Sequence, residues 1–133
     1  MRERFLLPQL GEIRFVHDLP LVELCNGLVA EALARGFERL EVVAPQTGSA
    51  IAEIRAYKQD VGSPFFAVPS SMHRRVVRRF KAMAKMRRAR PADTQGVIHF
   101  ERVRSKPIEI PVMLRPGSDG QADVVMTLPI RES

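Results

Sequence analysis

The stretch PLVELCNGLVAEALARG, residues 20–36, decides the fold of this chain. Its apolar residues recur every three or four positions, which places them along one side of an α-helix. Pro20 suits the first turn of a helix, and Gly36 suits the left-handed residue that ends one. The pattern predicts a core-facing helix over residues 20–35. Cys25 falls on its apolar side, where we expect a small buried side chain rather than a nucleophile.

Two strand patterns follow this helix. Residues 38–43 form a short segment with Leu40, Val42 and Val43 as its apolar residues, and residues 49–58 alternate apolar with other side chains. The sequence Pro-Gln-Thr-Gly at positions 45–48 is a typical turn, so the two segments predict a β-hairpin. Residues 59–69 contain Gly62, Pro64 and Pro69, which favour a connector or a short edge strand.

The last third of the chain predicts three antiparallel strands in a meander, at residues 97–104, 108–114 and 123–130. A glycine-rich turn at 116–120 separates the last two. The predicted fold class is α+β: a helix, a β-hairpin, a basic helix and then the three-strand meander, with the helices packed on a mostly antiparallel sheet. We expect residues 20–130 to form this single domain and residues 1–19 to form an N-terminal segment.

The strongest indication of function is the basic segment between the hairpin and the meander. Nine of the 21 lysines and arginines lie between positions 74 and 90, and residues 61–92 include no acidic residue. The 12 basic residues elsewhere are outnumbered by 15 acidic ones, so the net charge of +6 comes from this segment. Apolar and basic residues recur with helical period over 72–88, which predicts an amphipathic helix that Ser70 or Ser71 could cap.

The charged side of this helix is the candidate site for an anionic partner. Like charges at helical spacing destabilise a helix by about 0.2–0.5 kcal/mol per pair unless counter-charge meets them. Phosphate, an acidic protein face, an anionic membrane and plain solvation all suit such a helix. The candidate partner-binding residues are Arg74, Arg75, Arg78, Arg79, Lys81, Lys85 and Arg88.

Motifs for catalysis and metal binding are absent from the sequence. It contains neither G-x-x-x-x-G-K-[ST] nor H-E-x-x-H, and its three histidines are not at ligand spacing: His17, His73 and His99. We therefore expect no enzymatic activity, no catalytic residue, no metal and no cofactor.

The predicted hairpin offers a further candidate for an anion contact. Arg39, Arg55 and Lys58 could form an anion site if their side chains share one face of the sheet. Cross-strand ion pairs that involve Arg39 and Glu41 are the favoured alternative.

The sequence indicates a cytoplasmic protein. A single cysteine allows no disulfide framework, and no apolar run approaches the roughly 18–20 residues that span a bilayer. The N-terminal sequence MRERFLLP breaks before the apolar core of a signal peptide could form. We expect no transmembrane segment, with peripheral contact to the inner membrane left open.

The order of several segments carries a family resemblance. A helix that ends in Ala-x-x-x-Gly leads into a short strand (residues 32–45), and a strand with basic residues follows (55–61). A basic helix (78–86), a Gln-Gly turn into a strand (94–98) and two closing strands (108–115 and 123–128) complete the order. This order resembles the domain before the motor of type II secretion and type IV pilus ATPases. The resemblance implies docking on such an ATPase or on an envelope-assembly protein, and in that family arginines of this domain reach toward nucleotide bound by the motor.

Three functions remain open from the sequence. The first is a non-catalytic regulatory or interaction domain that docks on a protein through the basic helix 72–88. The second is a weakly sequence-specific nucleic-acid-binding module that uses the same helix, although aromatic residues for base stacking amount to only 6% of the chain. The third is an enzyme of unrecognised class or a binder of a small anion.

Overall fold

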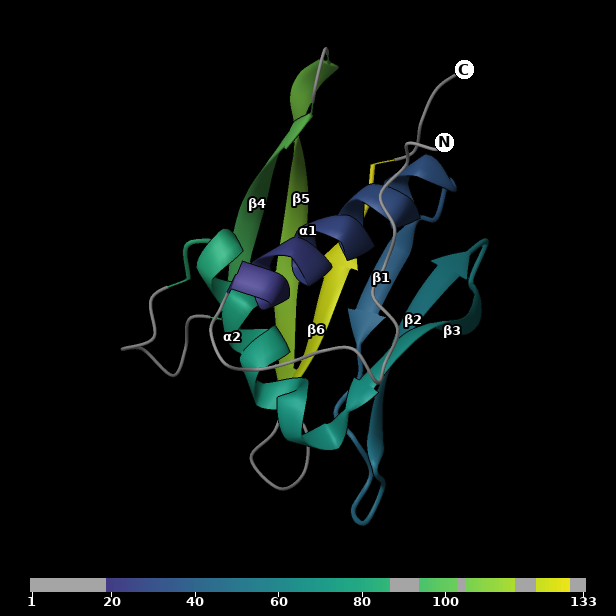
Figure 1. The fold of residues 1–133 in the computed structure, drawn as a ribbon. Coiled ribbons are helices and arrows are strands. Elements are labelled where there is room, and N and C mark those ends of the chain that lie inside the picture. Colours follow the sequence, from purple (N-terminus) through teal and green to yellow (C-terminus); the bar gives the residue numbers. More distant parts are fainter. Residues whose placement is uncertain (1–18, 87–93, 103–104, 117–121, 130–133) are drawn as a thin grey trace.

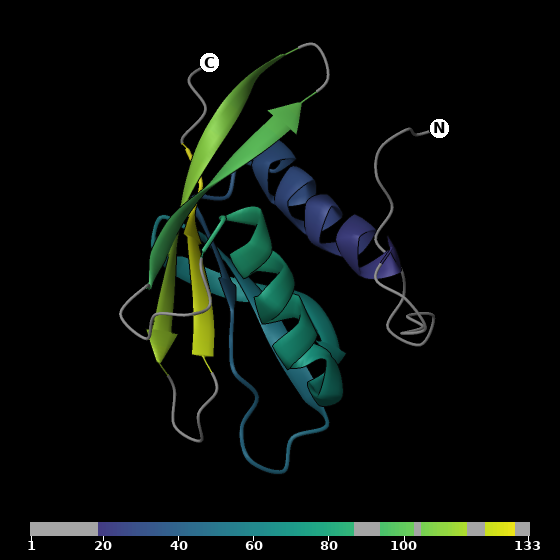
Figure 2. The same cartoon turned by 90° about the vertical axis from the view of Figure 1, so that its left-hand side faces the viewer.

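The computed structural model describes residues 19–86, 94–102, 105–116 and 122–129. Two α-helices lie against the same face of one antiparallel sheet (Figure 1, Figure 2). The helices are α1 (Leu19–Ala34) and α2 (His73–Met83), and a 3-10 turn, η2 (Ser70–Met72), leads into α2. The strands are β1 (Arg39–Val42), β2 (Ile51–Lys58), β3 (Val61–Pro69), β4 (Gln95–Arg102), β5 (Ser105–Pro116) and β6 (Ala122–Thr127).

The six strands form one continuous sheet in the order β3-β2-β1-β6-β5-β4. Each half is a meander of three sequence-consecutive strands, preceded by one helix. The halves join where β1 pairs with β6, with Leu40 opposite Met126 and Val42 opposite Val124. A strand from the first third of the chain therefore lies beside the last strand at the centre of the sheet.

The predicted fold class is wrong in its balance between helix and sheet. The helix, the hairpin over β1 and β2, and the meander over β4 to β6 were all expected, and each is present. Of the two possibilities for residues 59–69, the edge strand is the correct one: residues 61–69 form the nine-residue strand β3 beside β2, and β1 pairs with β6. The described residues therefore form a six-stranded antiparallel sheet with two short helices, and the sheet dominates the fold.

The hydrophobic core lies between the sheet and the two helices. Alternate residues of each strand face the helices, as the period of two in a pleated strand requires. Phe80 of α2 and Leu24 and Leu28 of α1 are almost fully buried against this face. The strands contribute the largest remaining core side chains, Leu40, Ile54, Ile98, Ile110 and Met126.

The C-terminal end of α1 agrees with the prediction. Gly36 has a φ of 79°, and its N–H donates to the carbonyl of Leu33 at 3.1 Å. The N–H of Phe37 donates to the carbonyl of Ala32, also at 3.1 Å, which completes a Schellman motif. The predicted C-terminal glycine is thus confirmed.

The two ends of α2 differ from the prediction. No side chain caps its start, because Met72, which has no suitable acceptor, occupies the cap position, and the Ser70 hydroxyl donates to the Ser49 carbonyl at 2.7 Å. The α-helix ends at Met83, where Lys85 adopts a left-handed φ of 58°. The N–H of Met86 then donates to the carbonyl of Lys81 at 3.0 Å, another Schellman ending. The amphipathic helix is therefore shorter than the expected range 72–88.

Gly96 allows the end of α2 to approach the sheet closely. A Cβ atom at this position of β4 would lie 2.8 Å from the carbonyl oxygen of Ala84 and 3.0 Å from the Cβ of the same residue. Because a carbonyl of the main chain cannot rotate away as a side chain can, the contact between α2 and β4 depends on glycine here.

Candidate functional site

The predicted apolar and basic sides of α2 are both present in the structure. Val76 and Phe80 are fully buried beneath the helix, with Met72 and Ala84 beyond its two ends. We define the basic face as Arg74, Arg75, Arg78, Arg79, Lys81 and Lys85. Arg74, Arg75, Arg78 and Lys85 are exposed, while Arg79 and Lys81 are half-buried. Arg88, the seventh predicted residue, lies outside the described residues.

Most of the basic face makes no ion pair with the described residues. In the part of the chain that the structure describes, no ion pair involves Arg74, Arg78, Arg79, Lys81 or Lys85. The adjacent helix α1 has no basic residue in its sequence, and its charged residues are Glu23 and Glu31. The concentrated positive charge therefore belongs to a single helix.

Arg79 is the least exposed of the arginines on the basic face. Its Nε is buried and has no hydrogen-bond partner. Burial raises the pKa of Cys25 on α1 to about 12, and the positive charge of Arg79 opposes this rise. The Arg79 side chain thus lies near the buried side of α1 rather than extending fully into solvent.

The first residue of α2, His73, is a buried histidine with a structural contact. Its Nε2 lies 2.9 Å from the carbonyl oxygen of Ala122, the first residue of β6, and its Nδ1 has no partner. Burial lowers the pKa of His73, and the Ala122 carbonyl and the charge of Asp123 oppose that change. The imidazole therefore favours the neutral form and fixes the start of α2 to the sheet.

The three residues of the hairpin anion candidate do not share one face of the sheet. Lys58 lies on the helix side, where its Nζ donates to the carbonyl of Arg35 at 2.9 Å and sits 5.1 Å from the centre of the Phe37 ring. Arg39 and Arg55 lie on the opposite, open face, each 2.9 Å from a carboxylate oxygen, of Glu41 and Glu53 respectively. The expected ion pairs between the two strands of the hairpin are replaced by pairs within each strand, and the three cations are not brought together.

The open face holds a charge network that the sequence did not reveal. Glu41 is buried there, and its carboxylate accepts hydrogen bonds from Arg39 at 2.9 Å, Arg115 at 3.3 Å and the Tyr57 hydroxyl at 3.4 Å. Arg115 also donates to Asp123 at 2.9 Å, and this hydrogen bond is the main cause of the raised pKa of Arg115. The network satisfies its own charges, which indicates a structural role.

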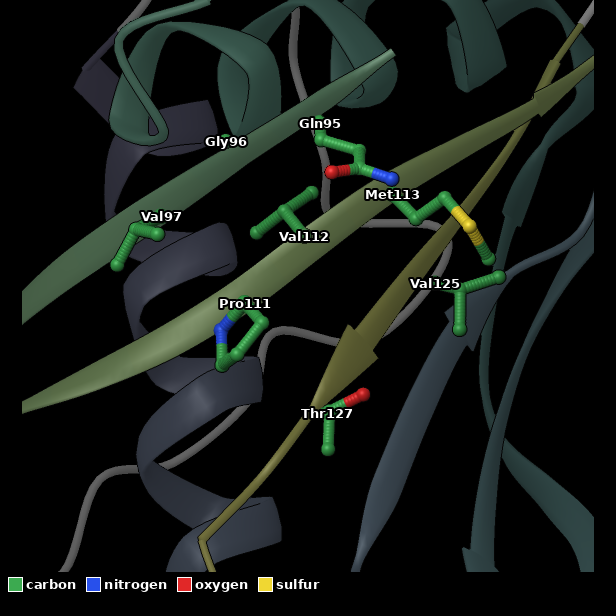
Figure 3. Close-up of a pocket in the computed structure, with 8 residues that line it drawn as sticks. All are labelled: Gln95, Gly96, Val97, Pro111, Val112, Met113, Val125 and Thr127. Carbon is green, nitrogen blue, oxygen red and sulfur yellow. The ribbon is translucent and has the colours of Figure 1, made fainter.

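A shallow apolar groove lies beside this network on the open face, over β4, β5 and β6. Its volume is about 450 Å³, and Figure 3 shows Pro111, Met113 and Val125 among the side chains that line it. Met113 is 43% exposed. Its lining residues carry no charge, and their polar side chains are those of Gln95 and Thr127, so the groove offers mainly apolar contact area.

The described part of the chain offers no constellation for metal chemistry or for spanning a bilayer. Within residues 19–86, 94–102, 105–116 and 122–129, no three histidine, cysteine or acidic residues gather in a way that could hold a metal ion. Neither α1 nor α2 combines the length and the apolar character needed to cross a membrane.

Comparison of the sequence with models of known protein families gives no match, and no curated protein matches the chain.

Proposed function

We propose that this domain is a non-catalytic interaction module that docks on an acidic protein surface through the basic face of α2. The observation that carries the proposal is the row of exposed basic side chains without ion-pair partners in the described residues, Arg74, Arg78 and Lys85 above all. Leaving like charges this close together disfavours the isolated helix, and an acidic partner would remove that cost.

The shape of the positive surface favours a protein partner over nucleic acid. The 11 residues of α2 extend about 16 Å at 1.5 Å per residue, and the helix beside it carries only acidic charges. The one aromatic residue of α2, Phe80, is fully buried and cannot stack on a base. Weakly sequence-specific binding to nucleic-acid phosphates through the same arginines is the alternative, and the experiment below separates the two.

The resemblance to the pre-motor domain of type II secretion and type IV pilus ATPases suggests which partner to expect. We propose a secretion or pilus ATPase, or another protein of envelope assembly, at the cytoplasmic side of the inner membrane. The fully buried free thiol of Cys25 suits a reducing compartment. The described domain would act on that partner by contact.

Affinity capture from a lysate of the source cells tests this proposal. The bait is the full chain, with Arg74→Glu/Lys85→Glu as the docking variant and Arg35→Glu/Arg55→Glu as a control with the same change in net charge. Arg35 and Arg55 lie off α2 and make only local ion pairs. We expect a protein that survives nuclease treatment, is lost with the docking variant and is retained by the control. Capture that nuclease abolishes would favour the nucleic-acid alternative.

A further inference from the structure

A hollow of about 210 Å³ lies between α1 and α2. Leu21 of α1 and Ala82 of α2 give it an apolar lining, and Arg75, Arg78 and Arg79 complete it. Three arginines around one small space bring together three positive charges. Such an arrangement is favourable when an anion accepts hydrogen bonds from the guanidinium groups.

Arg79 lines this hollow without a hydrogen-bond or ion-pair partner in the described part of the chain. Its Nε is buried, so an anion in the hollow would reach the two terminal nitrogens of the guanidinium. No acidic residue of the described chain pairs with Arg78 or Arg79.

We propose that this hollow binds the phosphate group of a phosphate monoester, with Arg79 as the buried anchor and Arg75 and Arg78 on the solvent side. A monoester carries about −1.5 to −2 charges near neutral pH and three terminal oxygens, so it provides an acceptor for each arginine. A carboxylate offers one charge and two oxygens, and a phosphodiester offers one charge.

The size of the hollow restricts recognition to the phosphate itself. Pockets that enclose whole small molecules measure roughly 300–1,000 Å³, which exceeds the space between α1 and α2. The rest of the phosphate monoester therefore lies outside the hollow. The hollow shares Arg75, Arg78 and Arg79 with the basic face. The docking variant changes only Arg74 and Lys85, so the two proposals can fail separately.

The test is a titration of the full chain with glycerol 3-phosphate. Calorimetry measures the affinity, and NMR measures the signals of the arginine Nε–H groups. The variants are Arg79→Met, Arg78→Met and, as a matched control outside the hollow, Arg74→Met. We expect the Arg79 Nε–H signal to shift on binding. Arg79→Met should weaken binding at least tenfold, and Arg74→Met by less than twofold. If Arg79→Met does not fold, Arg78→Met takes its place in the comparison, because Arg78 is exposed.

Further ligands define the class of anion and its carrier. Dimethyl phosphate, a diester, should bind at least tenfold more weakly than glycerol 3-phosphate. Tighter binding of a phosphoserine peptide than of glycerol 3-phosphate would assign the monoester to a protein, and equal binding would assign it to a free compound. The proposal is overturned if Arg79→Met binds like the wild type, if Arg74→Met loses as much affinity as Arg79→Met, or if the diester binds equally well.

Discussion

Arg115 on β5 reaches across β6 to Glu41 on β1, with 3.3 Å between its NH2 nitrogen and the Oε1 of the carboxylate. The two strands are not neighbours in the sheet, since β6 lies between them. Arg115 also bonds to Asp123 on β6 itself, so one guanidinium contacts strands from both halves of the sheet. This side chain therefore links the two three-strand meanders on the open face.

Loss of that link should destabilise the domain. Arg115→Met leaves the buried Glu41 carboxylate with fewer hydrogen-bond donors. We expect the free energy of unfolding to fall by about 1–2 kcal/mol, less than for a fully buried pair because Arg115 is half exposed. Arg35→Met breaks the exposed ion pair between Arg35, just after α1, and Glu31 of α1. It should lower the free energy of unfolding by only about 0.3–0.5 kcal/mol. Urea unfolding of both variants measures the difference, and equal losses would remove the special role of Arg115.

The contact between Gly96 and the end of α2 predicts a steric effect. Gly96→Ala places a methyl group against the backbone carbonyl of Ala84, and overpacking of this kind costs about 1–3 kcal/mol. Gly62→Ala is the matched comparison, because there the added methyl meets the ring of Tyr57, a side chain that can move. Thermal unfolding should give the lower Tm for Gly96→Ala. The opposite order would contradict the close approach of α2 to β4.

The left-handed conformation of Lys85 predicts a stabilising substitution. A residue with a side chain at this φ is strained by roughly 1–2 kcal/mol, and glycine is not. Lys85→Gly removes the strain together with a charge, whereas Lys85→Ala removes only the charge. We expect Lys85→Gly to be about 1 kcal/mol more stable than Lys85→Ala in chemical denaturation, after allowance for the greater freedom of glycine in the unfolded chain. Equal stability would mean that Lys85 is not left-handed in solution.

His73 predicts a loss of stability in mild acid. Its pKa is lowered in the folded state, so below the ordinary value of about 6.5 the unfolded chain binds the proton more readily than the folded one. The contribution of neutral His73 is complete above that pH and is lost as the pH falls from there toward the lowered pKa. Unfolding free energies measured from pH 8 to pH 5 should decline with a slope of up to about 1.4 kcal/mol per pH unit. His73→Gln should reduce that slope, and an unchanged slope would contradict the prediction.

The local patterns of the sequence were enough to find most elements of the fold. The period of α1 and the position of Gly36 predicted the first helix and its end, and the alternation in β2 and β5 predicted strands. The pairing of β1 with β6 could not be predicted in this way, because it joins residues more than 80 positions apart. For residues 59–69, Pro64 and Pro69 left a connector and a short edge strand open. The structure has the edge strand, because an edge position tolerates proline and a bulge near residue 65 accommodates the irregular pairing.

The candidate site was predicted in composition but not in geometry. The basic side of α2 followed from helical spacing, because that spacing is local. The unpaired Arg79 Nε and the hollow beside Leu21 depend on how α1 packs against α2, which no periodicity contains. The same limit explains why Glu41, Arg115 and Asp123 were missed as a group, and why Lys58 was grouped with two arginines that face the other side of the sheet.

Docking of α2 on an acidic protein is tested most directly by binding kinetics. The association rate and the affinity of the captured and purified partner for this domain are measured at several salt concentrations. The account predicts that Arg74→Glu/Lys85→Glu lowers the association rate at least tenfold and flattens its dependence on salt, while Arg35→Glu/Arg55→Glu behaves nearly like the wild type. If the two double variants lose the same affinity, or neither loses any, the basic face of α2 is not the docking surface.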